Sequence, residues 1–233
     1  MPSSVSHKRI RRSPAARRAE IVVAASMVAL REGLECITLR RIAEELGVRP
    51  GLISHYFPAV EDLVAEAYGD AAGGELDSLL PADRADATPT RHLARFFSLA
   101  TGTAYDDISR LWLNARHLSR YRPLLRDRVA AQESAWRGRL KELIRDGVAL
   151  GEFRSRDAAV AAMQILVVID GLGAHANTAD ADRPPEIAQM AVLTAERELG
   201  LPPGALSTGA TTTDATDATD ATDATDATDA TSN

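Results

Sequence analysis

Apolar residues recur at helical spacing along most of the chain. Thr38 stands at an N-cap position, and four apolar residues after it lie three or four positions apart, so they share one face of a short helix: Leu39, Ile42, Ala43 and Leu46. Gly47 suits the left-handed residue that ends a helix, and Pro50 favours the first turn of a second helix ending near Tyr56. Two short helices joined in this way form a helix-turn-helix, although the same geometry is common in ordinary helical packing.

Further periodic segments predict helices on both sides of this pair. We expect one helix over residues 14–33 and another from residue 60 to about 73. Gly73, Gly74 and the segment 81–89 are loop signals that bracket a short helical piece. Longer helices follow, at about residues 91–105, 107–120, 123–150, 157–177 and 184–199.

The segment 157–177 is the most apolar part of the chain, with almost no charge from Met163 to Leu172. A helix that is apolar on most sides must be buried on most sides, so we expect it to face a partner chain as well as its own core. With the last helix, it would form a four-helix interface in a homodimer. The candidate interface residues are Ile165, Ile169, Leu172, His175, Met190 and Leu193.

Composition supports an all-α fold. Of the 233 residues 45% are hydrophobic and 4% aromatic, and the alternation of β-branched residues typical of strands is absent. The one cysteine, Cys36, cannot form an internal disulfide; we interpret it as a small buried side chain, with an oxidant sensor as the alternative. We find no signal-peptide pattern and no apolar run of about 18 residues, so we expect a cytoplasmic protein with no membrane partner.

Charge is divided unevenly along the chain. Residues 1–57 hold ten Lys and Arg against five Glu, about +5, whereas residues 58–233 hold seventeen against twenty-eight Asp and Glu, about −11. A basic N-terminal end attracts phosphates. The cluster within residues 1–12 is either an arm that contacts DNA or a solubilising tail. The six Asp-Ala-Thr triplets of residues 214–231 predict a disordered acidic tail.

No catalytic constellation stands out. The histidines His7, His55, His92, His117 and His175 form no HExxH pair, a single cysteine excludes CxxC, and no glycine-rich phosphate loop is present. Asp170 and His175 are five positions apart, which places them on different faces of one helix for a shared metal. We therefore predict a protein that is not an enzyme and uses no metal and no cofactor.

The residues around the two short helices resemble the signature of the TetR family of transcriptional regulators. The matching positions are Thr38, Ile42, Ala43, Gly47, Val48, Gly51, Ile53, Tyr56, Phe57 and Leu63. The segments 51–57 (GLISHYF) and 169–172 (IDGL) are similar to the BetI-type branch, which responds to choline. Two positions depart from the pattern: Ser54 stands where most relatives have Tyr, and Val60 stands where a Lys usually reaches a phosphate.

The resemblance implies an all-α protein with an N-terminal three-helix DNA-binding domain that contains the helix-turn-helix, connected to a larger helical ligand-binding and dimerisation domain. The boundaries we expect are 1–13 for a flexible basic arm, 14–58 for the DNA-binding domain, 59–202 for the effector and dimerisation domain, and 203–233 for the tail. Such a protein would be a homodimeric repressor, released from a palindromic operator by a small molecule, and nucleoid-associated when bound to DNA. An activator of the same fold, or a ligand-binding module that has lost specific DNA binding, are the alternatives; Val60 and the acidic tail motivate the second.

The resemblance also implies roles for single residues. Those expected to face base edges are Arg49, Pro50, Gly51, Leu52 and Ser54. Those expected to hold phosphates are Thr38, His55 and Tyr56, assisted by Arg17. Arg49 has the chemistry to bind guanine O6 and N7 together, Ser54 offers one hydrogen bond, and Leu52 offers contact with a thymine methyl group or, alternatively, helix packing.

Aromatic residues of the larger domain are candidates for a ligand pocket between its helices: Phe96, Phe97, Tyr105, Trp112 and Trp136. Aromatic faces bind quaternary ammonium groups by cation–π attraction, and the BetI-type resemblance makes a choline-like or amine effector one candidate. Core packing is the alternative for most of these side chains. The sequence does not identify the effector.

Overall fold

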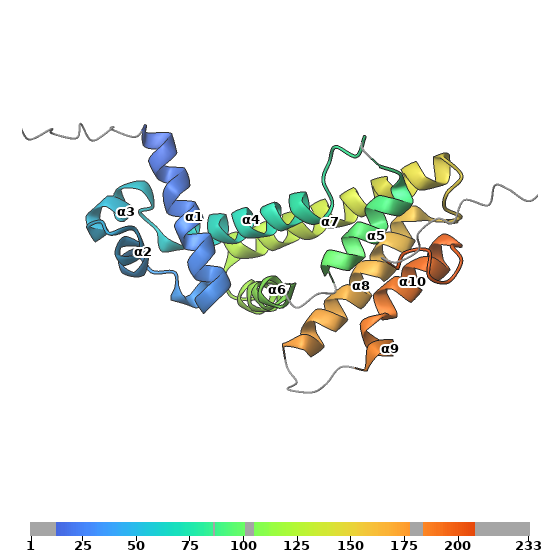
Figure 1. Cartoon of the computed structure of the whole chain (residues 1–233). Helices are drawn as coiled ribbons and strands as arrows, with labels where there is room; N and C mark the ends of the chain where they lie inside the picture. Colours follow the sequence, from blue (N-terminus) through green and yellow to red (C-terminus); the bar gives the residue numbers. More distant parts are fainter. Residues whose placement is uncertain (1–12, 86, 101–104, 178–183, 208–233) are drawn as a thin grey trace, which may run out of the picture.

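The computed structural model describes residues 13–85, 87–100, 105–177 and 184–207, and all regular structure in these residues is helical (Figure 1). This confirms the all-α prediction. The N-terminal helices, α1 (Pro14–Glu32), the 3-10 turn η1 (Leu34–Cys36), α2 (Leu39–Leu46) and α3 (Pro50–Tyr56), form a small domain that we call the head. It lies at one end of an elongated molecule, and the larger domain lies at the other (Figure 1).

The predicted start and stop signals of the helix-turn-helix are confirmed. The Thr38 hydroxyl accepts a hydrogen bond from the Arg41 backbone N–H at 3.0 Å, which satisfies one of the unpaired donors at the start of α2. Gly47 ends the helix with a left-handed backbone, at φ 63° and ψ 37°. Ile53 and Phe57 point into the core of the head and are almost completely buried, as their spacing of four predicts.

Two long helices, α4 (Val60–Leu79) and α7 (Pro123–Ala149), run side by side from the head into the larger domain (Figure 1). The prediction that α4 stops near Gly73 is wrong, because both Gly73 and Gly74 lie inside the helix. A Cβ on Gly69 would lie 2.8 Å from Cδ of Arg128 on α7, so the missing side chain lets the two helices approach. This packing outweighs the low helix propensity of glycine.

The larger domain packs α4 and α7 together with the remaining helices. These are α5 (Pro89–Ala100), α6 (Asp106–Leu118), α8 (Ala158–Ala176), α9 (Pro185–Ala188) and α10 (Met190–Leu199). The single helix expected over residues 184–199 is divided into α9 and α10, with Gln189 between them. The predicted helix over 91–105 begins at Pro89 and ends at Ala100, before residues that lie outside the description.

Within the described residues, α8 is long and apolar enough by length and composition to cross a membrane, so the expectation of no such run is wrong. One side of α8 packs against α6, α7 and α10. The opposite side leaves apolar residues exposed at positions 160, 163 and 167. α8 therefore has the length and composition of a membrane-spanning helix, although it packs in a helical domain. One of its faces stays exposed and apolar.

Besides the ion pair between Arg18 on α1 and Glu66 on α4, two polar contacts join the head to the larger domain. The buried Ser26 hydroxyl on α1 lies 3.0 Å from the Ala67 carbonyl oxygen and 2.8 Å from Asp70 Oδ2, both on α4. Asn114 on α6 accepts a hydrogen bond from the Leu34 backbone N–H at 2.9 Å and donates to the Glu35 carboxylate at 2.8 Å. Both α4 and α6 therefore contact the head directly.

Candidate functional site

The helix-turn-helix presents a polar surface around α3. Arg49, Pro50, Gly51, Ser54 and His55 are exposed. Among the other residues predicted to contact DNA, Leu52 and Tyr56 are half-buried, and Thr38 is exposed although its oxygen caps α2. Because that oxygen acts as acceptor towards the backbone, the Thr38 hydroxyl proton stays available to a phosphate.

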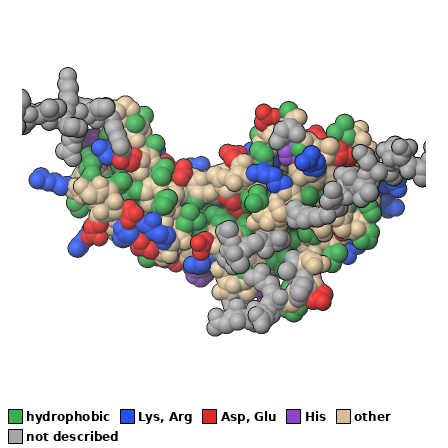
Figure 2. All heavy atoms as spheres, viewed as in Figure 1, with side chains coloured by type: hydrophobic (Ala, Val, Ile, Leu, Met, Phe, Trp, Pro, Cys, Tyr) green, Lys and Arg blue, Asp and Glu red, His purple; other side chains and the backbone are tan. Residues whose placement is uncertain are grey.

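The arginines of the head are mostly paired with glutamates. The pairs are Arg17 with Glu20, Arg18 with Glu66, Arg31 with Glu45, Arg40 with Glu44, and Arg41 with Glu32 and Glu45. Figure 2 shows basic and acidic side chains beside one another on the head. Arg18 also lies over the Phe57 ring, 4.6 Å from its centroid, so it covers the core of the head. Arg17 makes its predicted approach to DNA only in competition with Glu20.

Arg49 differs from these five arginines. It is the N-cap residue of α3, it is exposed, and among the described residues no carboxylate pairs with it. An unpaired guanidinium group at the start of a recognition helix keeps all its donors free for a base edge. The sequence pointed to this residue, and the structure adds that its neighbours are neutralised while Arg49 is not.

The described part of the head has little net charge. Residues 13–57 hold six arginines and five glutamates, about +1. The other four basic residues counted in the N-terminal segment are Lys8, Arg9, Arg11 and Arg12, which lie outside the described residues. The excess positive charge of this end therefore belongs to the predicted basic arm.

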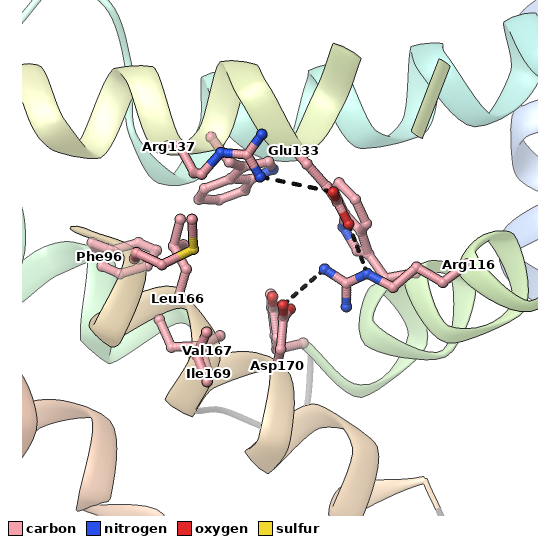
Figure 3. A pocket seen from close by; sticks show the side chains of 12 residues that line it. Phe96, Arg116, Glu133, Arg137, Leu166, Val167, Ile169 and Asp170 are labelled. Carbon is pink, nitrogen blue, oxygen red and sulfur yellow. Dashed lines mark hydrogen bonds and ion pairs between the residues drawn. The ribbon is translucent and has the colours of Figure 1, made fainter. Parts of the chain in front are cut away.

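A cavity of about 260 Å³ lies in the larger domain, between α5, α6, α7 and α8 (Figure 3). Four aromatic side chains contribute to its lining: Phe96, Tyr105, Trp112 and Trp136. α8 supplies an apolar side through Met163, Leu166, Val167 and Ile169. These aromatic residues come from α5, α7, α6 and the turn before α6, and only the tertiary fold brings them together.

Four charged side chains also line the cavity, two of each sign. Arg116 donates to Glu133 Oε1 at 3.1 Å and to Asp170 Oδ2 at 2.8 Å, and its guanidinium carbon lies 5.2 Å from the centroid of the Trp112 ring. Arg137 lies 3.7 Å from Glu133 Oε2. Figure 3 shows Arg116 and Asp170 reaching towards each other from α6 and α8. The cavity is thus aromatic and charged at once.

A fifth ionisable group, Glu75 on α4, lies behind the aromatic lining. Its Oε2 accepts a hydrogen bond from Trp112 Nε1 at 2.7 Å, and its carboxyl group is also hydrogen-bonded to the Tyr105 side chain. The other oxygen, Oε1, is buried without a hydrogen-bond partner. Burial raises the pKa of Glu75 to about 7, because removal of the carboxylate from water disfavours its charged form.

The indole of Trp136 leaves a second polar atom unsatisfied. Its ring lines the cavity and is 6% exposed, yet the buried Nε1 has no hydrogen-bond partner within the described residues. An unpaired buried N–H costs free energy unless an acceptor reaches it. A ligand with an oxygen atom at that point would satisfy it.

Four of the five aromatic residues proposed from the sequence therefore line one cavity. Phe97 does not line it; this side chain is 1% exposed in the core and packs against Phe96. The charged groups, Glu75, Arg116, Glu133 and Asp170, were not proposed as pocket residues. Their sequence context gave little signal, because each lies in a helix among other charged or apolar residues, and the contacts of Glu75 with Trp112 and of Arg116 with Glu133 and Asp170 join residues 17 to 54 positions apart.

The residues proposed for a dimer interface divide into two groups. Ile165 and Ile169 are 0% and 4% exposed, so they pack in the core of their own subunit. Met190 and Leu193 are 43% and 49% exposed on α10, His175 is exposed, and Leu172 is half-buried. The apolar side chains that α8 exposes are different ones, Val160, Met163 and Val167. The run was too uniformly apolar for its outer face to be identified from sequence.

Cys36 is exposed, contrary to the interpretation of a buried side chain. Its Sγ lies 3.3 Å from the Glu32 backbone carbonyl oxygen. The 3-10 turn η1 buries Leu34 instead, since only one side of so short a turn faces the core.

Two family models match this chain. The model for bacterial regulatory proteins of the tetR family matches residues 21–67, and the model for the C-terminal part of BetI-type transcriptional repressors matches residues 97–199. The chain belongs to the TetR family. The first match covers the helix-turn-helix, and the second covers the helices that enclose the cavity. The resemblance seen in the sequence is confirmed over both domains.

Solved structures share the fold. A transcriptional regulator from Saccharomonospora viridis in complex with choline is 25% identical, with a TM-score of 0.67, and the match covers 79% of this chain and 98% of that one. A TetR transcription regulator from Haloarcula marismortui is 24% identical, with a TM-score of 0.65 and coverage of 80% and 97%. FadR from Bacillus subtilis, in complex with stearoyl-CoA, is 21% identical, with a TM-score of 0.57 and coverage of 78% and 97%. No curated protein sequence matches the chain.

Membership of this family makes the protein a transcriptional regulator with a DNA-binding helix-turn-helix and a ligand-binding domain, not an enzyme. The chemistry of its two sites agrees with this division. The head offers an exposed polar helix, and the larger domain offers a partly open cavity.

Proposed function

We propose that the protein is a homodimeric, cytoplasmic repressor that leaves a palindromic operator when a small organic cation occupies its cavity. The observation that carries the DNA-binding part is Arg49, which lies exposed and unpaired at the start of α3 while the other five arginines of residues 13–57 are neutralised. Arg49 is the strongest candidate for sequence readout, because bidentate contact with guanine needs a free guanidinium group.

The other residues of this surface have supporting roles in the proposal. Ser54 supplies one hydrogen bond to a base, and Gly51 and Pro50 let the start of α3 approach the groove. His55, Tyr56 and Thr38 hold phosphates and so fix the orientation of α3. Arg17 gives up its ion pair with Glu20 and binds a phosphate oxygen instead.

The proposed dimer forms through the apolar face of α8 and α10. Met163, Val167, Met190 and Leu193 are all between 43% and 60% exposed, which is a large apolar surface to leave in water. Two helices from each subunit would pack as a four-helix interface. Met163 and Val167 also line the cavity, so a partner packed there would cover part of its entrance.

Two observations favour an organic cation as the effector. The cavity combines four aromatic side chains with two carboxylates that Arg116 and Arg137 balance, and the faces of aromatic rings bind ammonium groups. The regulator from Saccharomonospora viridis, which has the same fold, was crystallised with choline. An oxygen atom a few bonds from the ammonium group would be placed to accept from Trp136 Nε1, and choline carries such an oxygen.

Release would follow from two of the contacts that join the domains. A ligand that binds more tightly when α4 and α6 are displaced shifts the population towards that arrangement. Ser26 and Asn114 transmit the displacement, because one fixes α1 to α4 and the other fixes η1 to α6. The separation of the two recognition helices then no longer matches the operator.

The proposed domain boundaries follow the same division: a basic arm (1–13), a DNA-binding domain (14–58), an effector and dimerisation domain (59–202) and an acidic tail (203–233). The head ends with α3, and α4 carries the connection onward. Residues 1–12 and 208–233 lie outside the described residues, whereas Ser13 caps α1 and Leu206 is buried in the core.

Selection of genomic DNA fragments by the purified full-length protein tests this function. We expect enrichment of a palindrome whose half-sites lie roughly 34–36 Å apart, or slightly more, and loss of binding when choline is added. Arg49→Ala should remove the enrichment, whereas the matched variant Arg40→Ala, which breaks an exposed ion pair in α2, should preserve it.

The absence of an enriched palindrome, with a folded dimer and low salt, would favour a ligand-binding module without specific DNA binding. Two features of the molecule favour that second candidate. The head has a charge of only about +1 over residues 13–57, and the first turn of α4 holds Val60, Glu61 and Asp62 where a phosphate contact is expected. Enrichment next to activated genes would instead indicate an activator.

A further inference from the structure

Charge balance around the cavity points to Glu75. The two carboxylates of the lining, Glu133 and Asp170, are matched by Arg116 and Arg137, with ion-pair distances of 2.8 to 3.7 Å. The charges of these four groups largely cancel. Glu75 has no basic partner at ion-pair distance among the described residues, so its ionisation decides whether the surroundings of the cavity are neutral or negative.

Glu75 is also in contact with the aromatic lining itself. It accepts from the indole N–H of Trp112, and it is hydrogen-bonded to Tyr105. A carboxylate that accepts from an indole N–H increases the electron density of the ring, and a cation on the ring face is attracted both by the ring and by the charge behind it. A neutral carboxyl group raises the electron density of the ring much less and carries no charge to attract the cation.

The groups that surround Glu75 leave its ionisation undecided. Tyr68 and Tyr105 approach it from α4 and from the turn before α6, Arg116 from α6, and Asp170 from α8. Burial disfavours the carboxylate most strongly, and Asp170 adds to this, whereas the hydrogen bonds from Trp112 and Tyr105 and the charge of Arg116 favour it; the pKa of about 7 reflects this competition. At neutral pH both forms of Glu75 are therefore populated in the empty protein.

We propose that Glu75 is the residue that makes the cavity selective for cations, and that a bound cation drives the release of one proton from its carboxyl group to solvent. The inference rests on the proposed function, since it concerns the same cavity. The balance is simple: neutral Glu75 and a free cation become a Glu75 carboxylate with a bound cation and one proton taken up by the buffer. No covalent bond is formed or broken in the ligand.

Because Glu75 lies on α4, the loss of its proton also affects the packing between helices. When the carboxyl group ionises, its hydrogen bonds to Trp112 and Tyr105 become charge-assisted and stronger. Trp112 belongs to α6, so the packing between α4 and α6 tightens at the point where the cavity ends. These are the two helices that contact the head.

Isothermal titration of the full-length protein with choline, at pH 6, 7 and 8 and in buffers of different ionisation enthalpy, tests the inference. We expect affinity to rise by up to about tenfold per pH unit below the pKa of Glu75 and to level off above it. The buffer dependence should show release of up to one proton near pH 6 to 7. The uncharged isostere 3,3-dimethylbutanol should bind without release of a proton.

Glu75→Gln keeps an oxygen acceptor for Trp112 and removes the ionisable group, so it should bind choline several-fold more weakly and with no pH dependence. The matched control is Asp77→Asn on the same helix, where the carboxylate is exposed and paired with Arg139. This control should retain the pH dependence of the wild type. If Glu75→Gln does not fold, the buffer dependence of the wild type still decides the question.

Four outcomes would count against the inference. Choline binding without proton release, or an unchanged pH dependence in Glu75→Gln, would overturn it and leave the proposed effector class intact. Equal affinity for choline and its uncharged isostere would overturn the selectivity. A lack of binding by choline and by tetramethylammonium at every pH would overturn the effector class and this inference together, while operator selection would still test the DNA-binding function.

Discussion

The arginines of the head and of the cavity differ in what surrounds them. In the head, ion pairs lie at the surface, and the exposed fraction of the arginine side chain ranges from 29% for Arg17 and Arg41 to 84% for Arg40. In the cavity, Arg116 lies between two carboxylates and over an aromatic ring, and it is 31% exposed. The difference lies in the surroundings and not in the exposed fraction: the ion pairs of the head face open solvent and salt, whereas Arg116 lines a cavity with aromatic walls, where screening by solvent is weaker.

This difference teaches where single residues matter. Exposed ion pairs contribute little each, so the head must bind DNA through the sum of many phosphate contacts and a few base contacts. In the cavity the dielectric response is weaker, and one carboxyl group such as Glu75 changes the electrostatics of the whole site. We expect substitutions in the head to change salt dependence and those near the cavity to change pH dependence.

The largest effect should come from removing the basic arm. Replacement of Lys8, Arg9, Arg11 and Arg12 by alanine removes nearly all the excess positive charge of the N-terminal end. If these residues neutralise phosphates, the slope of log affinity against log salt should fall by up to about 3.6, with roughly 100-fold weaker binding at 50 mM salt. Fluorescence anisotropy on operator DNA measures both. An unchanged slope would identify the segment as a solubilising tail.

Arg49→Ala should have the next largest effect. Loss of a bidentate base contact is expected to cost roughly 1–3 kcal/mol and to relax preference at one base position in each half-site. Choline affinity should stay as in the wild type, because the cavity is in the other domain. Competition with operator variants at that position measures the preference. Retention of full preference would show that another residue reads the base.

Glu75→Gln should change how stability depends on pH. The pKa of Glu75 is raised to about 7 in the folded protein, so its neutral form is favoured by folding. This contribution is fully present below the unfolded pKa of about 4.5 and is lost as pH rises through about 7, by roughly 1–3 kcal/mol. The wild type should therefore lose stability relative to Glu75→Gln between pH 5 and pH 8.5. Urea unfolding of the two proteins at these two pH values measures the difference. A constant difference would contradict the raised pKa.

A smaller effect is expected at the contact between the two regions. Asn114→Ala removes the acceptor for the Leu34 N–H and the donor to Glu35, without touching either the cavity lining or α3. Operator affinity should change less than threefold, whereas the choline concentration that releases half of the DNA should rise about fivefold, a coupling loss of roughly 1 kcal/mol. Asp107→Asn on the same helix is a matched control, because the Asp107 carboxylate is exposed, pairs with Arg110 and contacts neither the head nor the cavity lining. Equal release curves would exclude Asn114 from the coupling.

The sequence alone determined where the helices of the helix-turn-helix begin and end and which side of α3 is buried. The start and stop signals are local: the Thr38 cap, the left-handed Gly47 and Pro50 at the start of α3 act within a few residues of where they stand. The spacing of Ile53 and Phe57 likewise separates the buried from the exposed side of α3 without reference to the rest of the chain. Local signals are strong where an element is short and bounded by special backbone conformations.

Only the tertiary structure decided the cavity and the course of α4. Gly73 and Gly74 read as a break, but contact with α7 keeps α4 helical, because packing outweighs propensity. Phe96 and Phe97 are adjacent in sequence, yet one lines the cavity and the other fills the core. Glu75 meets Trp112 across 37 positions, and its role depends on burial, which periodicity does not reveal. A charge acquires its chemistry from the neighbours that the fold supplies, and those neighbours are distant in the chain.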